Sequence, residues 1–320
     1  MKKIIHSIEK YKVGKTIKQY LRARVFWFAF TEILRLGISK ISLELLREIV
    51  YLKIQKKLKR KYGYVLKNIS ADFESQKNPR KIWVCWFQGL DRAPDIVKLC
   101  IASIKENFKE YELIILTERN FRNYISFPEV IEKRIEMNHI TLTHLSDLLR
   151  VELLIKYGGI WIDSTVLVTS NSISSEILNA DFFMFQELKP GSEGHSLPIS
   201  SWFIVSKPNH PILLATRSLL YEYWKKNTRL IDYFLLHHFI NISKDCFTQL
   251  WKRVPRYPNS LPHLLQLELF EEYSEVRLKE IYRLTSIHKL SYKLEKEDIQ
   301  KDNTFFDKVI SKKIDKHTIV

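Results

Sequence analysis

A chain of 320 residues with 45% hydrophobic and 12% aromatic content can bury a full core, and this composition excludes a disordered protein. Its three cysteines, Cys85, Cys100 and Cys246, are scattered without Cys-x-x-Cys spacing, which argues against a disulfide framework or a zinc site. The formal charge of +16 is uneven, because residues 1–78 carry 19 Lys and Arg against 6 Asp and Glu.

The N-terminal quarter has a helical pattern. An apolar run at 25–30 is much shorter than the roughly 20 residues that a membrane span needs. Apolar residues at helical spacing over 43–54 lead into the cationic cluster 56–61, a pattern that favours adsorption to an anionic membrane surface. A helical hairpin that packs on the rest of the protein is the alternative. Nucleic-acid binding is not expected, since no zinc finger or RNA-binding motif is present.

A boundary is expected at 76–79, where the charge falls and the pattern changes, so we predict a basic helical region 1–78 and an α/β domain 79–320. Continuous apolar runs at 82–87 and 113–116 predict buried strands. The helix between them begins at Pro94, which predicts a parallel, right-handed crossover. Loops at the ends of such strands are natural contacts for a nucleotide, and short helices at 121–125 and 128–138 follow.

The most informative stretch runs from 143 to 165. Its first part predicts an amphipathic helix on which Asp147 and Arg150 project from the same side. Gly158 and Gly159 allow the chain to end this helix and reverse tightly. The buried strand 160–162 follows at once, and Asp163 stands where that strand meets its loop. A carboxylate at a strand end is therefore expected to face the Asp147–Arg150 pair.

The remaining pattern alternates strands and helices. Apolar runs predict strands at 166–168, 182–185 and 200–205, and helical spacing predicts helices at 212–224 and 230–242. The loop 189–196 carries glycines and serines between two strands, a place where substrate contacts and lids are common.

The combination Ser-Asp-x-x-Arg at 146–150 and Tyr-Gly-Gly-x-x-x-Asp at 157–163 resembles the donor-site signature of retaining sugar-nucleotide glycosyltransferases. The resemblance is strongest to bacterial capsular polysaccharide synthesis glycosyltransferases, which are related to glycosyltransferase family 32. It covers residues 80–270. It implies a GT-A-type nucleotide-sugar-binding fold, a Rossmann-like mixed sheet flanked by helices, here with a helical N-terminal extension.

The resemblance also implies roles for individual residues. Asp147 and Arg150 would hold the donor sugar and its phosphate, and Asp163 would be the first aspartate of an Asp-x-Asp-like motif. Trp86 and Gln88 are candidates for the nucleotide base, and Trp161 either packs near the donor or is a core aromatic. These families use Mn²⁺ or Mg²⁺, but Thr165 stands where a second aspartate is usual. The expected metal ligands are therefore Asp163, Thr165 and a later residue, with His238 or Asp232 preferred over Glu187.

The implied function is transfer of a hexose, galactose or glucose, from a UDP-sugar to a lipid-linked oligosaccharide in surface polysaccharide synthesis. The partners are then UDP-sugar, the lipid-linked acceptor and the anionic inner face of the cell membrane, to which a cytoplasmic protein would bind peripherally. Transfer to a protein is a rival within enzymes. A catalytically silent, membrane-associated scaffold is the alternative from another class, made possible by the missing second aspartate.

Overall fold

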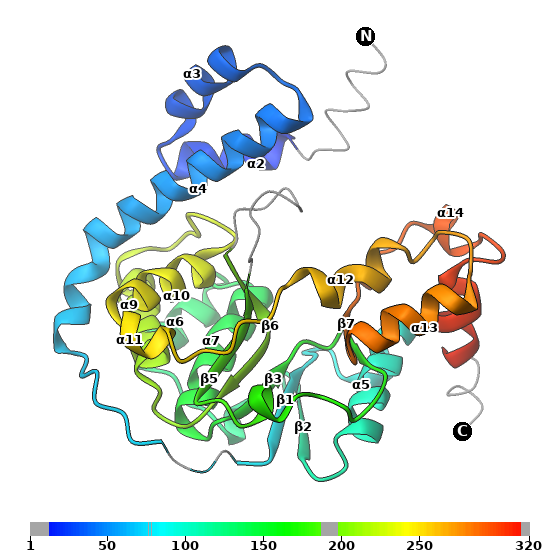
Figure 1. Ribbon diagram of the computed structural model, residues 1–320. Helices are drawn as coiled ribbons and strands as arrows, with labels where there is room; N and C mark the ends of the chain where they lie inside the picture. Colours follow the sequence, from blue (N-terminus) through cyan, green and yellow to red (C-terminus); the bar gives the residue numbers. More distant parts are fainter. Residues whose placement is uncertain (1–12, 76, 78, 187–197, 315–320) are drawn as a thin grey trace.

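A five-stranded mixed sheet forms the centre of the molecule (Figure 1). The computed structural model describes residues 13–75, 77, 79–186 and 198–314. The strands lie in the order β2, β1, β3, β6, β5, with β1 parallel to both β2 and β3 and with β6 antiparallel to β3 and β5. Their bounds are Lys81–Cys85 for β1, Glu112–Leu116 for β2, Gly159–Ile162 for β3, Phe182–Gln186 for β5 and Ile199–Ser206 for β6.

Side chains alternate across this sheet and bury both of its faces. Trp83 and Trp161 point into one core, whereas Ile82 and Ile160 point into the other. Helices cover the first face: α6 Glu129–Glu136, α7 Leu142–Lys156, α9 Pro211–Lys226 and α10 Leu235–Cys246. The second face is covered by α5 Asp95–Asn107 together with α12 Ser260–Leu267, α13 Glu275–Leu284 and residues 305–314. The predicted α/β class with a mixed sheet is confirmed.

A two-stranded antiparallel sheet stands beside the main one. Its strands are β4, Val166–Val168, and β7, Ile287–Lys289, and Val166 pairs with Lys289. Lys289 follows Thr165 by 124 residues in the sequence, but this pairing places it beside Val166, next to Thr165. Lys289 therefore lies near the end of β3.

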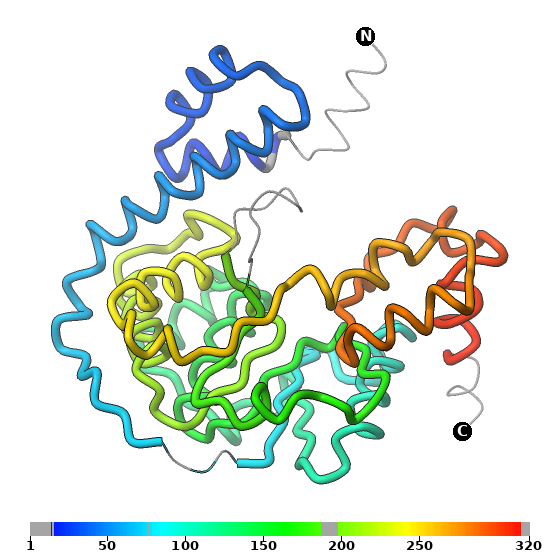
Figure 2. The backbone as a smooth tube through the Cα atoms, in the orientation of Figure 1, coloured from blue at the N-terminus to red at the C-terminus, as the bar shows by residue number. Residues whose placement is uncertain are grey.

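The N-terminal helices extend away from the sheet. They are α2 Val13–Arg22, α3 Phe26–Leu36 and α4 Lys40–Tyr62, followed by the 3₁₀ turn Gly63–Asn68. The chain then crosses the outside of the molecule to β1 (Figure 2). The lower half of α4 shares a core with α9 and α10 through Leu58 and Tyr62, so the predicted helical extension is confirmed. The boundary at 76–79 stays a prediction. In the described part of the chain, no helix is long and apolar enough to cross a membrane.

Two expected boundaries are corrected. The first strand ends at Cys85 rather than at 87, because Trp86 and Phe87 turn out of the sheet at its carboxyl edge. The helix expected over 230–242 begins only at Leu235. Asp232 accepts a hydrogen bond from the backbone N–H of Phe234, and the Tyr223 hydroxyl accepts one from Ile231, so residues 230–234 form a fixed loop.

The turn between α7 and β3 needs both of its glycines. Gly158 and Gly159 have φ angles of 65° and 98°, and a Cβ on Gly159 would lie 2.4 Å from the backbone oxygen of Lys81. Since neither strand can move without breaking the sheet, Gly159→Ala is expected to lower the free energy of unfolding by about 2–4 kcal/mol. Gly63→Ala is the matched control, because Gly63 has a right-handed backbone and a Cβ there would make only an ordinary contact, 3.8 Å from Lys59 Cγ. Urea denaturation measures the stability of both variants. Equal stability of Gly159→Ala and Gly63→Ala would contradict the predicted strain at Gly159.

Candidate functional site

A polar pocket of about 480 Å³ opens at the carboxyl ends of β1 and β3. The strand directions place Trp86 and Asp163 on the same edge, and β6 adds Ser201 because Ile162 pairs with Phe203. The helix α7, the loop before α10 and the residues after β7 complete the walls. The main lining residues are Trp86, Gln88, Ser146, Asp147, Arg150, Trp161, Asp163, Thr165, Ser201, Tyr233, His237, Lys289 and Tyr292. The sequence-predicted Trp86, Gln88, Asp147, Arg150, Trp161, Asp163 and Thr165 are thus brought together.

Arg150 is the fixed centre of this pocket. Its side chain is only 6% exposed, and its Nη2 lies 3.2 Å from Asp147 Oδ1 and 3.7 Å from Asp163 Oδ1. Its Nη1 donates to the backbone oxygen of Ser201 at 2.6 Å and to the Ser201 hydroxyl at 3.0 Å. Bonds to Ser146 hold the other side of the guanidinium. The cation is therefore preorganised between two carboxylates, as the three-residue spacing on α7 predicts.

The two carboxylates differ in environment. Asp163 is 31% exposed, and its Oδ1 accepts a hydrogen bond from the indole N–H of Trp161 at 2.9 Å. Asp147 is less exposed, at 13%, and burial raises its pKa, with Arg150 and His144 opposing the shift and Asp163 adding to it. Asp163 therefore offers an exposed carboxylate oxygen to a ligand, while the charge of Arg150 opposes the rise in the pKa of Asp147. Trp161 is a core residue, as one of the two expectations has it, and its indole N–H also orients Asp163; its packing near the donor stays a prediction.

Lys289 is a pocket residue that the sequence did not reveal. Its ammonium donates to the Thr165 hydroxyl at 2.6 Å and to the backbone oxygen of Leu290 at 3.0 Å. Burial lowers the pKa of Lys289, and the charge of Asp163 opposes that shift. Two fixed cations, Arg150 and Lys289, thus flank Asp163, as a site for an anionic group requires.

An aromatic pair stands at the other end of the pocket. Trp86 meets Tyr292 edge-on with ring centroids 5.3 Å apart, and the indole N–H of Trp86 has no hydrogen-bond partner among the described residues. An unpaired donor beside an aromatic pair suits a planar, hydrogen-bonding ligand group. Gln88 lies exposed at the same rim.

The expected metal ligands do not form one set. The Thr165 hydroxyl is occupied by the Lys289 ammonium, whose charge would repel a divalent cation at that oxygen. His238 is fully buried, stacked on Tyr51 with ring centroids 4.1 Å apart, and lies 3.8 Å from Asp232, which is not a wall of this pocket either. Glu187 lies outside the described residues.

The neighbouring His237 lines the pocket instead, and burial lowers its pKa to about 3, so its imidazole is neutral. Within the part of the chain that the structure describes, no three His, Cys, Asp or Glu side chains gather as metal ligands. The donor set predicted as Asp163, Thr165 and His238 therefore does not fit a divalent cation.

A mixed sheet with a pocket at its carboxyl edge, in which Arg150 and Lys289 lie with Asp147 and Asp163, defines an α/β protein with a charged site. The chain belongs to the capsular polysaccharide synthesis protein family, whose model matches residues 32–309, so the expected family is confirmed. Among solved structures it is similar to the PaToxG glycosyltransferase, at 16% identity and a TM-score of 0.39 over 75% of this chain and 95% of that one.

It is also similar to the catalytic domain of the alpha-toxin from Clostridium novyi, at 11% identity and a TM-score of 0.35 over 84% of this chain and 77% of the other. No curated protein sequence matches the chain.

Proposed function

We propose that this protein transfers a hexose from a UDP-sugar to a lipid-linked oligosaccharide, with retention at the anomeric carbon. Galactose and glucose are the donor sugars that the sequence resemblance favours. The observation that supports the proposal is Arg150, held between Asp147 and Asp163 beside Lys289 in the pocket at the strand ends. Family membership supports a role in surface polysaccharide synthesis.

The pocket can supply what the transfer needs. The bond between the anomeric carbon and the β-phosphate oxygen breaks, and negative charge grows on the departing diphosphate. Arg150 and Lys289 are fixed cations that would stabilise this charge without reorganising. The acceptor oxygen bonds to the anomeric carbon on the face that the leaving group vacates, and its proton passes to the departing phosphate oxygen. No protein nucleophile enters this sequence.

Asp163 would orient the donor by accepting hydrogen bonds from its hydroxyl groups, because this carboxylate is partly exposed and its other side is held by Trp161. The rings of Trp86 and Tyr292 would take the uracil. Turnover dependent on Mn²⁺ or Mg²⁺ stays a prediction, and no step here depends on it.

Release of UDP from a panel of UDP-sugars, with Mn²⁺ and with a chelator, tests the proposal. We expect one sugar to be turned over by the wild type, and Asp163→Asn, which keeps the side-chain volume, to lower kcat/KM by about 10²-fold. Asp298→Asn changes a carboxylate that pairs with Lys301 and does not line the pocket, and it is the control. If the folded wild type neither binds nor hydrolyses any UDP-sugar, the transferase proposal is wrong and the alternative, a catalytically silent scaffold protein, is favoured.

We also propose that α3 and the start of α4 attach the protein to the cytoplasmic face of the cell membrane. Large apolar side chains are exposed there, with Trp27 at 76%, Leu34 at 71% and Ile38 at 78%. Arg35 and Lys40 lie between or beside them. Apolar side chains next to cations are typical of helices that lie in a membrane interface.

The triple variant Trp27→Ser, Leu34→Ser, Ile38→Ser is expected to bind vesicles that contain phosphatidylglycerol at least about tenfold more weakly, because it loses the apolar area that would enter the bilayer. Vesicle sedimentation measures this. Leu267→Ser with Val276→Ser and Leu284→Ser removes three apolar side chains elsewhere that are 50–71% exposed, and is the control. Equal losses in both triple variants would contradict attachment through α3.

A further inference from the structure

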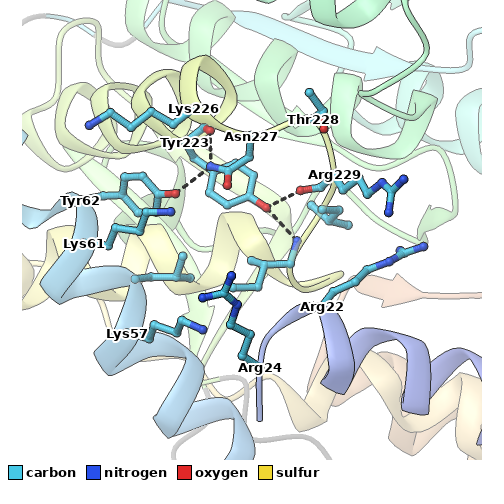
Figure 3. A pocket seen from close by; sticks show the side chains of 13 residues that line it. Arg22, Arg24, Lys57, Lys61, Tyr62, Tyr223, Lys226, Asn227, Thr228 and Arg229 are labelled. Carbon is cyan, nitrogen blue, oxygen red and sulfur yellow. Dashed lines mark hydrogen bonds between the residues drawn. The ribbon is translucent and has the colours of Figure 1, made fainter. Parts of the chain in front are cut away.

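A second pocket, of about 420 Å³, lies between the end of α2, the lower part of α4 and the loop that follows α9 (Figure 3). Six basic side chains line it: Arg22, Arg24, Lys57, Lys61, Lys226 and Arg229. No Asp or Glu is among the described residues that line it. Three segments far apart in the sequence therefore bring positive charge to one hollow.

Most of this charge is not neutralised by the protein. Lys226 forms an ion pair with Glu222 at 2.7 Å, but none of the other five has a carboxylate within 4.0 Å in the described parts of the chain. Lys57 donates to the backbone oxygen of Ala23 at 2.7 Å, which holds its ammonium beside the end of α2. Burial lowers the pKa of Lys57, and repulsion from Arg24, Lys61 and Arg60 lowers it further. Cations that repel one another in a hollow are stabilised by a bound anion.

The floor of the pocket is rigid. The Tyr223 hydroxyl donates to the backbone oxygen of Arg229 at 2.6 Å and accepts from the N–H of Ile231 at 2.8 Å. The amide of Asn227 donates to the Tyr62 hydroxyl at 2.7 Å and to the backbone oxygen of Tyr223 at 2.6 Å. These bonds, drawn in Figure 3, fix the loop after α9 against α4. The backbone segments that carry the cations are therefore held in place relative to one another, as a binding site requires.

The pocket lies between the proposed membrane face and the donor pocket. Arg22, Leu230 and Ile231 line it and also line a neighbouring hollow whose wall continues to Tyr233. Tyr233 in turn lines the donor pocket. On the other side, α2 leads into α3, which carries the exposed Trp27. A ligand with an apolar tail, an anionic middle and a sugar end would meet these surfaces in that order.

We propose that the pocket lined by Arg22, Arg24, Lys57, Lys61 and Arg229 binds the diphosphate of the lipid-linked acceptor. The lipid chain extends toward α3 and the membrane, and the sugar end extends past Tyr233 toward the donor. This inference rests on the proposed function and adds the place where the acceptor is held. Guanidinium and ammonium groups are the usual protein partners of diphosphate oxygens.

Binding of farnesyl diphosphate, a soluble prenyl diphosphate, to the full chain tests the proposal. Calorimetry is run with saturating UDP, so that UDP fills the donor pocket and farnesyl diphosphate cannot bind there. Lys57→Gln with Lys61→Gln is expected to weaken binding by at least about tenfold, because two charge-assisted contacts are lost. Lys56→Gln with Arg60→Gln removes the same charge from exposed positions of the same helix that do not line the pocket, and is expected to change binding less than about twofold.

Several outcomes separate this proposal from others. Equal losses of farnesyl diphosphate binding in both double variants, or no binding by a wild type that still binds UDP, would overturn it and leave the proposed function standing. A pocket variant that loses binding only to phosphatidylglycerol vesicles would assign the cations to bulk lipid and would also overturn the proposal. A pocket variant that loses binding only to a single-stranded oligonucleotide would overturn it as well. A wild type that binds farnesyl diphosphate but no UDP-sugar would instead overturn the proposed function.

Discussion

Arg150→Met is expected to lower kcat/KM for UDP-sugar turnover by about 10³–10⁵-fold, the range found when a cation that stabilises a departing phosphate is removed. Arg150 reaches Asp147, Asp163 and Ser201 together, so methionine removes the charge and releases both carboxylates. Methionine nearly keeps the length of the side chain, which limits the cavity.

The same substitution changes the pH dependence of stability. Arg150 lowers the pKa of Asp147 against the effect of burial, so the variant raises that pKa further above the value in the unfolded chain. A carboxyl with a raised pKa in the folded state binds more protons when folded, and stability then falls as pH rises through that pKa. The stability deficit of Arg150→Met is therefore expected to be small at acidic pH and to grow toward neutral pH.

Urea denaturation over a pH series, together with UDP release, measures both effects. Arg217→Met is the control, because Arg217 pairs with Glu152 at 3.5 Å on the helical side of the core and does not line the pocket. If Arg150→Met kept its activity within about tenfold of the wild type, Arg150 would not stabilise the leaving group.

Local patterns were sufficient to predict the elements that carry the first half of the site. The helix with Asp147 and Arg150, the two glycines and the strand before Asp163 lie within 23 residues, so their geometry follows from helix and strand periodicity. The continuous apolar strands likewise predict a sheet covered on both faces.

Long-range pairing explains what the sequence did not reveal. Lys289 reaches the site only because β7 pairs with β4, and three residues with little apolar pattern do not predict that pairing. His238 was expected at the site but does not line the pocket, for a related reason. Adjacent residues on a helix point about 100° apart, and the rotation of α10 is set by the packing of His238 against Tyr51 from α4.

Lys289→Met is expected to lower kcat/KM by about 10³-fold, because a half-buried cation in the pocket of Asp163 is lost from the place where the diphosphate would leave. Burial lowers the pKa of Lys289 below 10.5, so the wild-type kcat/KM should fall as pH rises through that lowered pKa, and the variant should lack this decline. In the folded state this lysine binds fewer protons than in the unfolded chain, so its burial costs stability at neutral pH. The variant should therefore unfold at equal or higher urea concentration.

Activity and stability are thus expected to move in opposite directions, which separates a role at the diphosphate from a merely structural one. Lys293→Met, at the exposed rim of the same pocket, is the matched control and should stay within about fivefold of the wild type. Measuring both variants with Mn²⁺ and with a chelator also tests the predicted metal. Wild-type activity that a chelator leaves intact and Lys289→Met abolishes would identify the lysine as the cation at the leaving group. Activity that requires Mn²⁺ and is unchanged in Lys289→Met would show that the metal supplies the positive charge at the leaving group. The metal would then be bound near Asp163 by a set of ligands that does not contain Thr165.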